Sequence, residues 1–157
     1  MAYHLKHKPE KWISPARILG MDHGSKTIGL AICDSNQLIV TPMQTIHRKK
    51  WKQDSQKIKD IIMQNDIEAI VVGYPLNMDG SAGGRCQSVK DFVMLMEETW
   101  PDMPFFFFDE RLSTTYVDKF LDNDRTKTRE KRKEFKDALA AQLILEDALS
   151  WAKNNCD

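Results

Sequence analysis

The hydrophobic pattern of this chain changes its period near residue 50, and that change limits the folds open to it. Three short apolar runs come first, at Arg17–Met21, Thr27–Cys33 and Leu38–Pro42, and turn residues separate them. Short runs with tight connections predict strands in an antiparallel meander. After residue 50, apolar stripes with helical spacing alternate with short runs rich in β-branched or aromatic residues. This alternation predicts parallel strands with helices on both faces of the sheet.

The later part of the chain predicts four helices and two buried strands. Ile58, Ile61 and Ile62 lie at i, i+3 and i+4 in WKQDSQKIKDIIMQ, which marks one face of a helix. The runs IEAIVVGYP (67–75) and FFFF (105–108) predict strands that are buried on both faces. Further helices are expected around residues 89–96, 113–121 and 134–153. The pattern as a whole predicts an α/β fold with a five-stranded mixed sheet.

Length, charge and cysteine content exclude several classes of protein. With 157 residues, the chain suits a single domain over 1–157, in which 1–16 are expected to be a loose, basic lead-in. Lys+Arg and Asp+Glu both total 23, which excludes a wholly basic nucleic-acid binder but permits a local basic patch. The three cysteines suggest neither a disulfide framework nor a metal pair. No stretch suits a membrane helix or a secretory signal, so we expect a cytoplasmic protein without a membrane partner.

Acidic residues follow two of the predicted strands. Asp22 ends the first apolar run, and Asp109 and Glu110 come directly after the four phenylalanines. Ligands of such sheets bind beyond the carboxyl ends of parallel strands, so we expect these carboxylates at one edge of the sheet. Because neighbouring strand residues face opposite sides, one member of the Asp109–Glu110 pair should point toward Asp22 and the other away.

A fourth acid, Asp137, lies on the packed face of the last predicted helix, in line with Ala141, Ile144 and Ala148. A carboxylate there is costly unless it is paired or binds a metal. The alternative is a favourable interaction with the helix dipole, because Asp137 falls in the first turn of the predicted helix. Several converging carboxylates would bind a divalent metal, and Mg²⁺ prefers such oxygen ligands. Two such ions can activate a water and stabilise the leaving oxygen in phosphodiester cleavage.

Four segments, in this order, resemble the YqgF family, which is also called RuvX and comprises pre-16S rRNA nucleases and Holliday junction resolvase-like proteins. They are MDHGSKTIGLAICD (21–34), IVVGYPLNMDGSAGG (70–84), FDERLSTTYVD (108–118) and KDALAAQLIL (136–145). The resemblance implies an RNase H-like fold. It also implies a bacterial cytoplasmic protein that processes the 5′ end of the 16S rRNA precursor.

The resemblance also implies roles for particular residues. The first-strand acid of the family falls on Asp22, its DER motif on 109–111, and its C-terminal acid on Asp137. Related resolvases carry a further acid at the end of the fourth strand, but that neighbourhood here, 72–75, has none. The Asp109–Glu110 pair must therefore supply the missing ligand. The expected catalytic residues are Asp22, Asp109, Glu110 and Asp137, and the expected Mg²⁺ or Mn²⁺ ligands are Asp22, Glu110 and Asp137.

Basic and polar residues around these acids are candidates for nucleic-acid contacts. Arg125–Lys136 holds seven Lys or Arg and two Glu, which is typical of a phosphate-binding segment but also of a solvated surface. Arg111 suits a phosphate contact or a structural ion pair. The loop before the second helix suits phosphate binding or a mobile surface loop. His23 is expected to be an exposed turn residue. The candidates are Lys26, Asn77, Ser81, Arg85, Arg111, Arg129 and Arg132.

Three classes of function compete on this sequence. The first is a metal-dependent endonuclease for structured nucleic acid, with pre-rRNA as the leading substrate, or branched DNA if the protein is a Holliday junction resolvase. The protein would be a monomer or a homodimer, and a resolvase needs two sites. The second class is a nucleic-acid-binding ribosome-assembly factor with little catalysis. The third is a phosphotransferase, because Asp22, Gly24 and Gly29 also resemble a phosphate loop of sugar kinases, but this chain is too short for their two domains.

Overall fold

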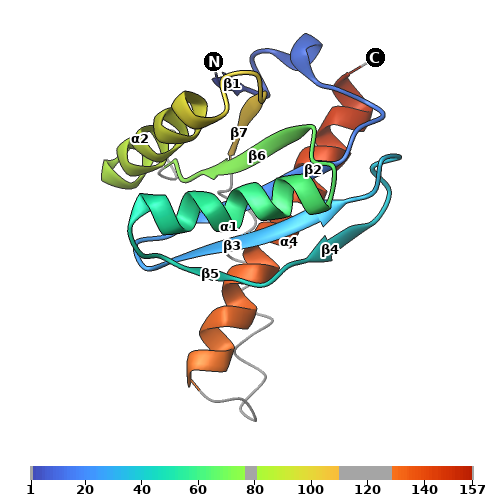
Figure 1. Ribbon diagram of the computed structural model, residues 1–157. Helices are drawn as coiled ribbons and strands as arrows, with labels where there is room; N and C mark the ends of the chain where they lie inside the picture. Colours follow the sequence, from blue (N-terminus) through green and yellow to red (C-terminus); the bar gives the residue numbers. More distant parts are fainter. Residues whose placement is uncertain (1, 77–80, 110–128, 157) are drawn as a thin grey trace.

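A mixed sheet forms the centre of the computed structural model (Figure 1), which describes residues 2–76, 81–109 and 129–156, with the backbone alone for 129–134. The strands are β1 (Ala2–His4), β2 (Ile18–His23), β3 (Thr27–Cys33), β4 (Val40–Pro42), β5 (Ile46–His47), β6 (Ala69–Tyr74) and β7 (Phe105–Asp109). Their order is β1-β7-β6-β2-β3-β4, and β5 also pairs with β3. The first four in this order run parallel, whereas β3 is antiparallel to β2, β4 and β5.

Helices cover both faces of the sheet, as predicted. The helices α1 (Trp51–Gln64) and α2 (Gly84–Thr99) lie on one face, and α4 (Arg129–Asn155) crosses the other (Figure 1). A short 3-10 helix, η1 (Pro9–Lys11), precedes β2. No helix in the described ranges has the length and apolar character needed to span a membrane. The expected helix around 113–121 lies outside the described residues.

Alternation along the central strands divides the core into two layers. Leu19 and Met21 of β2 pack with the α1 and α2 side, whereas Ile18 packs with the α4 side. In β7, Phe105 and Phe107 belong to the first layer, and Phe106 and Phe108 to the second. Both strands are buried on two faces, which is why they are continuous apolar runs in the sequence.

The five predicted strands are present, and the structure adds two short ones. One is β5, which continues the meander after β4. The other is β1, so the expectation of a loose segment over 1–16 is wrong: β1 pairs with β7, and Leu5 and Ala16 are fully buried. The edge of β7 offers unpaired backbone groups, and β1 takes them up. Three residues are too few to show a strand period, so β1 could not be predicted from the hydrophobic pattern.

The last helix begins at Arg129 rather than near Glu134. Figure 1 shows its first turns projecting beyond the sheet. Residues 129–134 have the sequence REKRKE, which carries no apolar stripe, and periodicity therefore underestimates the helix. As a result, Asp137 lies about two turns inside α4. An interaction with the dipole at the helix start therefore does not explain this acid, because that effect is confined to the first turn.

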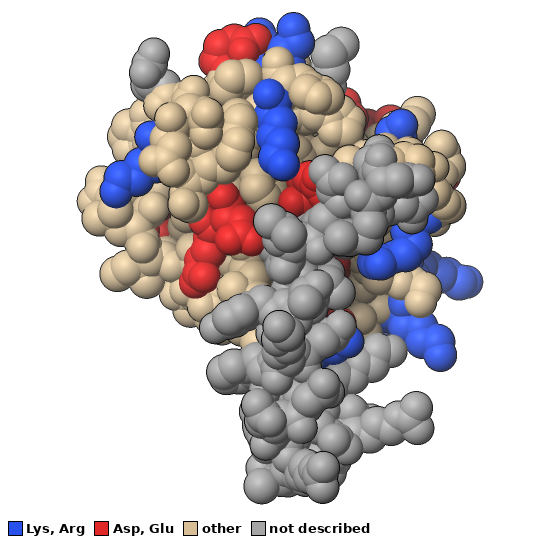
Figure 2. Space-filling view, turned by 180° about the vertical axis from the view of Figure 1, so that it is seen from behind, with Lys and Arg blue, Asp and Glu red and all other residues tan. Residues whose placement is uncertain are grey.

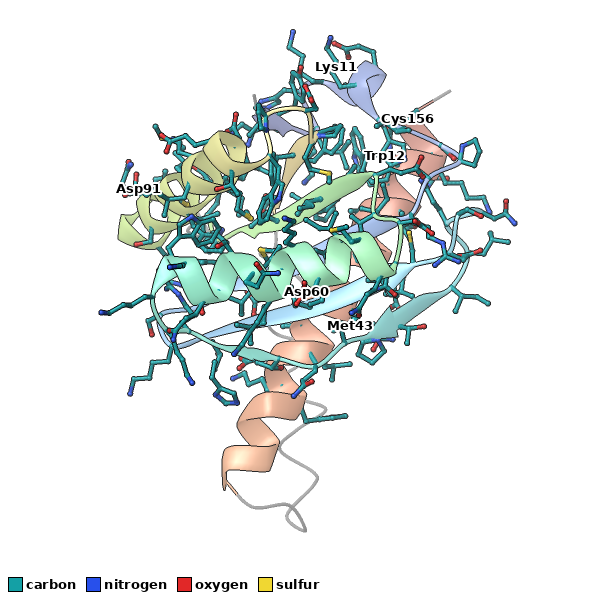
Figure 3. All side chains as sticks on the ribbon, in the orientation of Figure 1. Lys11, Trp12, Met43, Asp60, Asp91 and Cys156 are labelled. Atoms are coloured by element: carbon teal, nitrogen blue, oxygen red, sulfur yellow. The ribbon has the colours of Figure 1, made fainter. Side chains whose placement is uncertain are left out.

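The amino-terminal segment also packs against the core on the α4 side of the sheet. The indole of Trp12 lies 5.2 Å from the ring of Phe106, measured between centroids, and its Nε1 donates to Gln37 at 3.1 Å. Figure 3 shows Trp12 and Cys156 at the same end of the molecule. Residues before β2 therefore contribute to the core on the α4 side.

Candidate active site

Asp22 is the last residue but one of β2, and it faces α4. Leu19 and Met21 point to the α1 and α2 side, so strand alternation directs Gly20 and Asp22 to the opposite face. A Cβ placed on Gly20 would lie 2.7 Å from Cβ of Leu145 on α4. The helix thus lies directly on β2 at Gly20, two residues before the carboxylate.

Gly29 allows α4 to approach Asp22 closely. In the antiparallel ladder of β2 and β3, Gly29 is the register partner of Asp22. A Cβ on Gly29 would overlap the carbonyl oxygen of Asp137, so the backbone of α4 rests on this glycine. Asp137 therefore lies beside Asp22, although 115 positions of sequence separate 22 from 137.

Thr27 fixes the second carboxylate. Its Oγ1 donates a hydrogen bond to Oδ2 of Asp137 at 2.6 Å, and the threonine is 7% exposed. A short hydrogen bond to a charged acceptor is strong and directional. Asp22 and Asp137 are candidates from the sequence alone, but the roles of Thr27 and Gly29 are not visible there. Their spacing after the Asp22 turn is visible in the sequence, but their function depends on which helix crosses them.

The two carboxylates act on one another electrostatically. The pKa of Asp22 is raised from 3.8 to about 6, mainly by burial and then by the negative charge of Asp137. The positive charges of Arg85 and Lys136 oppose this rise. A half-buried pair of acids that repel each other is the kind of donor set that a divalent cation stabilises. The residues present therefore fit a metal at this position.

Asp109 is not part of that pair. It is the register partner of Tyr74, and it shares the α1 and α2 side of the sheet with Phe107. Its Oδ2 lies 3.8 Å from Nζ of Lys6. Among the described residues, no three His, Cys, Asp or Glu side chains form a group that could hold a metal. Glu110, the neighbour expected to face the other way, lies outside the described residues.

His23 departs from expectation, because it is buried rather than an exposed turn residue. Its ring stacks on Phe92 with centroids 4.5 Å apart. Burial lowers the pKa of His23 to about 4, and the charges of Arg48 and Arg85 add to this effect. Nη1 of Arg48 donates to the carbonyl oxygen of Gly24 at 2.8 Å. Neutral His23 and Arg48 therefore anchor the turn that follows Asp22.

The structure places three of the candidate nucleic-acid contacts at this edge. Lys26 is exposed in the turn between β2 and β3, Arg85 is exposed in the first turn of α2, and Ser81 is exposed before it. Arg85 is close enough to influence Asp22. Arg129 and Arg132 lie in α4, with undescribed side chains, and Asn77 and Arg111 lie outside the described residues.

Charge is unevenly distributed on the face that α4 covers. Figure 2 shows Asp and Glu side chains gathered over the middle of this face and a group of Lys and Arg toward its lower right. On α4 itself, Glu146 and Asp147 are exposed. The outer surface of the C-terminal half of α4 therefore repels a polyanion, whereas the edge with Lys26 and Arg85 attracts one.

A family model described as "RuvX: Holliday junction resolvase" matches residues 16–151. The chain belongs to the RuvX family. A relative from Ruegeria sp. (strain TM1040) is 43% identical over 132 residues, which are 84% of this chain and 83% of that protein. A relative from Beijerinckia indica subsp. indica is 41% identical over 144 residues, which are 90% of this chain and 86% of that protein. Both carry the name "Putative pre-16S rRNA nuclease".

Solved structures of resolvases share the fold of this RuvX-family chain. T. thermophilus RuvC in complex with Holliday junction substrate has a TM-score of 0.55 at 10% identity, over 90% of this chain and 98% of that one. The fowlpox virus resolvase with Holliday junction DNA has a TM-score of 0.50 at 11% identity, over 88% of this chain and 97% of that one. At these identities the likeness shows the fold alone, and it confirms the expected RNase H-like fold.

Proposed function

We propose that this RuvX-family chain is a metal-dependent endonuclease that cleaves phosphodiester bonds in structured nucleic acid, and that its substrate is the 5′ region of the 16S rRNA precursor. The observation that carries the proposal is the pairing of Asp22 with Asp137 at the carboxyl edge of the parallel strands, held by Thr27 and Gly29. The nuclease names of relatives about 40% identical support the reaction and the substrate. Such a substrate places the protein in the cytoplasm.

Asp22, Asp137 and Glu110 are the residues that would hold Mg²⁺ or Mn²⁺. The choice of Glu110 over Asp109 follows from the position of Asp109. Phe108 lies in the α4 layer and Asp109 on the opposite side, away from Asp22, which leaves Glu110 as the acid of the pair that we propose as a ligand. Asp109 is then a supporting acid, paired with Lys6. When bound, the metal would activate a water and stabilise the leaving oxygen.

The other proposed contacts position the nucleic acid. Arg85 and Lys26 flank the acids and suit the phosphates on either side of the scissile bond. Arg111, Asn77 and Ser81 are further candidates for phosphate contacts. Arg129 and Arg132 belong to the projecting turns of α4 and suit the backbone of a helical region farther from the cut (Figure 1).

Cleavage of precursor 16S rRNA by the purified protein with Mg²⁺ or Mn²⁺ tests this proposal, with the Asp22→Asn variant as the decisive comparison. The variant should lose cleavage by at least two orders of magnitude but still bind the RNA in EDTA. Asp60→Asn is the matched control, because Asp60 is exposed on α1, where it accepts a hydrogen bond from Gln56 (Figure 3). Full cleavage by Asp22→Asn would refute the assignment of this acid.

A four-way DNA junction in the same assay tests the second candidate, a Holliday junction resolvase. That candidate is favoured by the fold shared with two resolvases solved on junction DNA. A resolvase acts as a homodimer with two sites, so the mass of the protein in solution belongs to the test. If the wild-type protein binds pre-rRNA but cleaves neither substrate, it is an RNA-binding assembly factor.

A further inference from the structure

The amino-terminal strand brings cations to the edge of the sheet where the acids lie. In the parallel ladder of β1 and β7, His4 is the register partner of Phe107, and the amide of Leu5 donates to the carbonyl oxygen of Phe107 at 3.0 Å. Leu5 is fully buried and anchors the segment. Since β1 and β7 run in the same direction, the residues after β1 reach the edge at which β7 ends.

Aromatic rings and a tight turn organise these cations. The ring of His4 lies 4.9 Å from that of Tyr74 and 5.7 Å from that of His7, measured between centroids. The amide of His7 donates to the carbonyl oxygen of His4 at 2.9 Å, which turns the chain back over His4. From α2, Nζ of Lys90 lies 5.8 Å from the centre of the Tyr74 ring. We call Lys6, His7 and Lys90, which surround the ring of His4, the amino-terminal cation cluster.

The cluster holds more positive charge than its surroundings neutralise. Lys6 pairs with Asp109, but in the described part of the chain no carboxylate forms an ion pair with His7 or Lys90. Asp91, next to Lys90, accepts a hydrogen bond from Gln87 and lies on the outer side of α2 (Figure 3). The pKa of His4 is lowered by burial first and then by the charges of His7 and Lys90. A bound anion would relieve this repulsion.

The position of the cluster indicates which anion it suits. β1 is three strands away from β2, which is about 14 Å at the usual strand spacing. A nucleic-acid strand crosses that distance within a few nucleotides. We propose that the amino-terminal cation cluster is a second phosphate-binding subsite, which holds the backbone of the nucleic acid where it passes around the carboxyl ends of β7 and β1 to the α2 side of the sheet. This inference rests on the proposed function for its substrate class, but it concerns binding and not cleavage.

Fluorescence anisotropy with labelled single-stranded RNA from the 16S precursor, in EDTA to prevent cleavage, tests the subsite. The double variant His7→Ala/Lys90→Ala should bind about tenfold more weakly at 50 mM salt. Its plot of log affinity against log salt should be less steep by about 0.7, the share of the single-strand phosphate that the charge of Lys90 neutralises. Lys153→Ala, an exposed lysine in the last turn of α4, should change neither quantity. Lys90→Arg should bind like the wild type.

The subsite and the nuclease assignment fail in different ways. If the double variant keeps the affinity and the salt dependence of the wild type, the subsite is refuted, even if the wild type cleaves RNA with Mg²⁺. If the wild type binds but never cleaves, the nuclease is refuted, and a weakened double variant still supports the subsite. The three variants change only exposed side chains. Thermal unfolding midpoints equal to that of the wild type establish that each variant keeps the fold.

Discussion

Thr27 shows how one small side chain orients a carboxylate. Its hydroxyl is nearly buried and donates to Asp137 at 2.6 Å, so one oxygen of that acid has a fixed direction. The charge of the same carboxylate raises the pKa of Asp22. Removing the donor leaves the carboxylate in place but frees its rotation.

Thr27→Val keeps the shape of the side chain and removes the hydroxyl. We expect it to destabilise the protein by about 1–2 kcal/mol, the cost of an unmade hydrogen bond to a charged group. Mg²⁺ affinity should fall about tenfold, because the carboxylate is no longer oriented. Urea unfolding and calorimetric titration with Mg²⁺ measure the two effects. Thr27→Ser restores the donor and should recover most of the metal affinity; an equal loss in both variants would contradict the role of the hydroxyl.

The raised pKa of Asp22 makes the metal-free protein sensitive to pH. The carboxyl group titrates near 3.8 when unfolded but at about 6 when folded. Between these values the folded state binds the extra proton, so stability falls as the pH rises through this window and then stays low. The difference amounts to about 3 kcal/mol at pH 8.

Asp22→Asn removes this charge, and we expect it to be more stable than the wild type at pH 8 in EDTA but close to it at pH 3.5. The physical reason is that the amide needs no proton and does not repel Asp137. Urea unfolding at the two pH values gives the comparison, and Asp60→Asn serves as the exposed control. A stabilisation that is the same at both pH values would show that repulsion between the two acids is not its source.

At the scale of elements, the site depends on how closely α4 approaches β3. Gly29 is the point of contact, because a Cβ there would overlap the backbone of Asp137. Backbone atoms on both sides leave no flexible side chain to move aside. The helix and the strand would have to separate, and the separation would move Asp137 away from Asp22.

Gly29→Ala is therefore expected to destabilise the protein by about 2 kcal/mol or more, as overpacking does in tight cores. It should also abolish detectable Mg²⁺ binding. Gly84→Ala is the matched control: a Cβ there meets nothing within 4 Å, at the first residue of α2. That change should be neutral or stabilising by up to about 1 kcal/mol. Chemical unfolding of both variants distinguishes a steric effect from a general cost of replacing glycine.

Elements with a regular apolar stripe could be predicted from the sequence. Ile58, Ile61 and Ile62 predict a helix within 51–64, and α1 forms there. The start of α4 could not be predicted in this way, because residues 129–134 present no apolar face, and β1 is too short to show a period. The start of α4 continues a helix whose later residues are buried, and β1 pairs with β7 beside buried Leu5. A local hydrophobic pattern does not show such tertiary contacts.

At the scale of the whole molecule, the amino-terminal segment completes the sheet and belongs to its core. Leu5→Ala should destabilise the protein by about 2–5 kcal/mol, because Leu5 is fully buried. Lys8→Ala, an exposed neighbour, should cost almost nothing. Thermal unfolding of the two variants tests this expectation. A loose amino-terminal segment would tolerate both substitutions equally well.

Two acids of the candidate site could be predicted from the sequence, whereas the residues that position them could not. Asp22 and Asp137 follow from strand order and helix spacing, and the structure brings them together. The alternation argument predicts that one of Asp109 and Glu110 faces away, and Asp109 does. The roles of Gly29, Thr27 and buried His23 depend on contacts between distant segments. The sequence shows that those residues are small or polar, but it does not show which residues of other segments contact them.

The length of α4 has a consequence for where a cut would fall. The helix has 27 residues, about 40 Å, which exceeds the span of any strand in the sheet, and Asp137 comes eight residues after its start at Arg129. The helix would set a fixed distance, since about 12 Å of helix separates its first residue from Asp137. If the tip holds a duplex, the scissile bond falls at a fixed offset from that duplex, and inserting one helical turn would shift the cleavage position by about 5 Å along the strand.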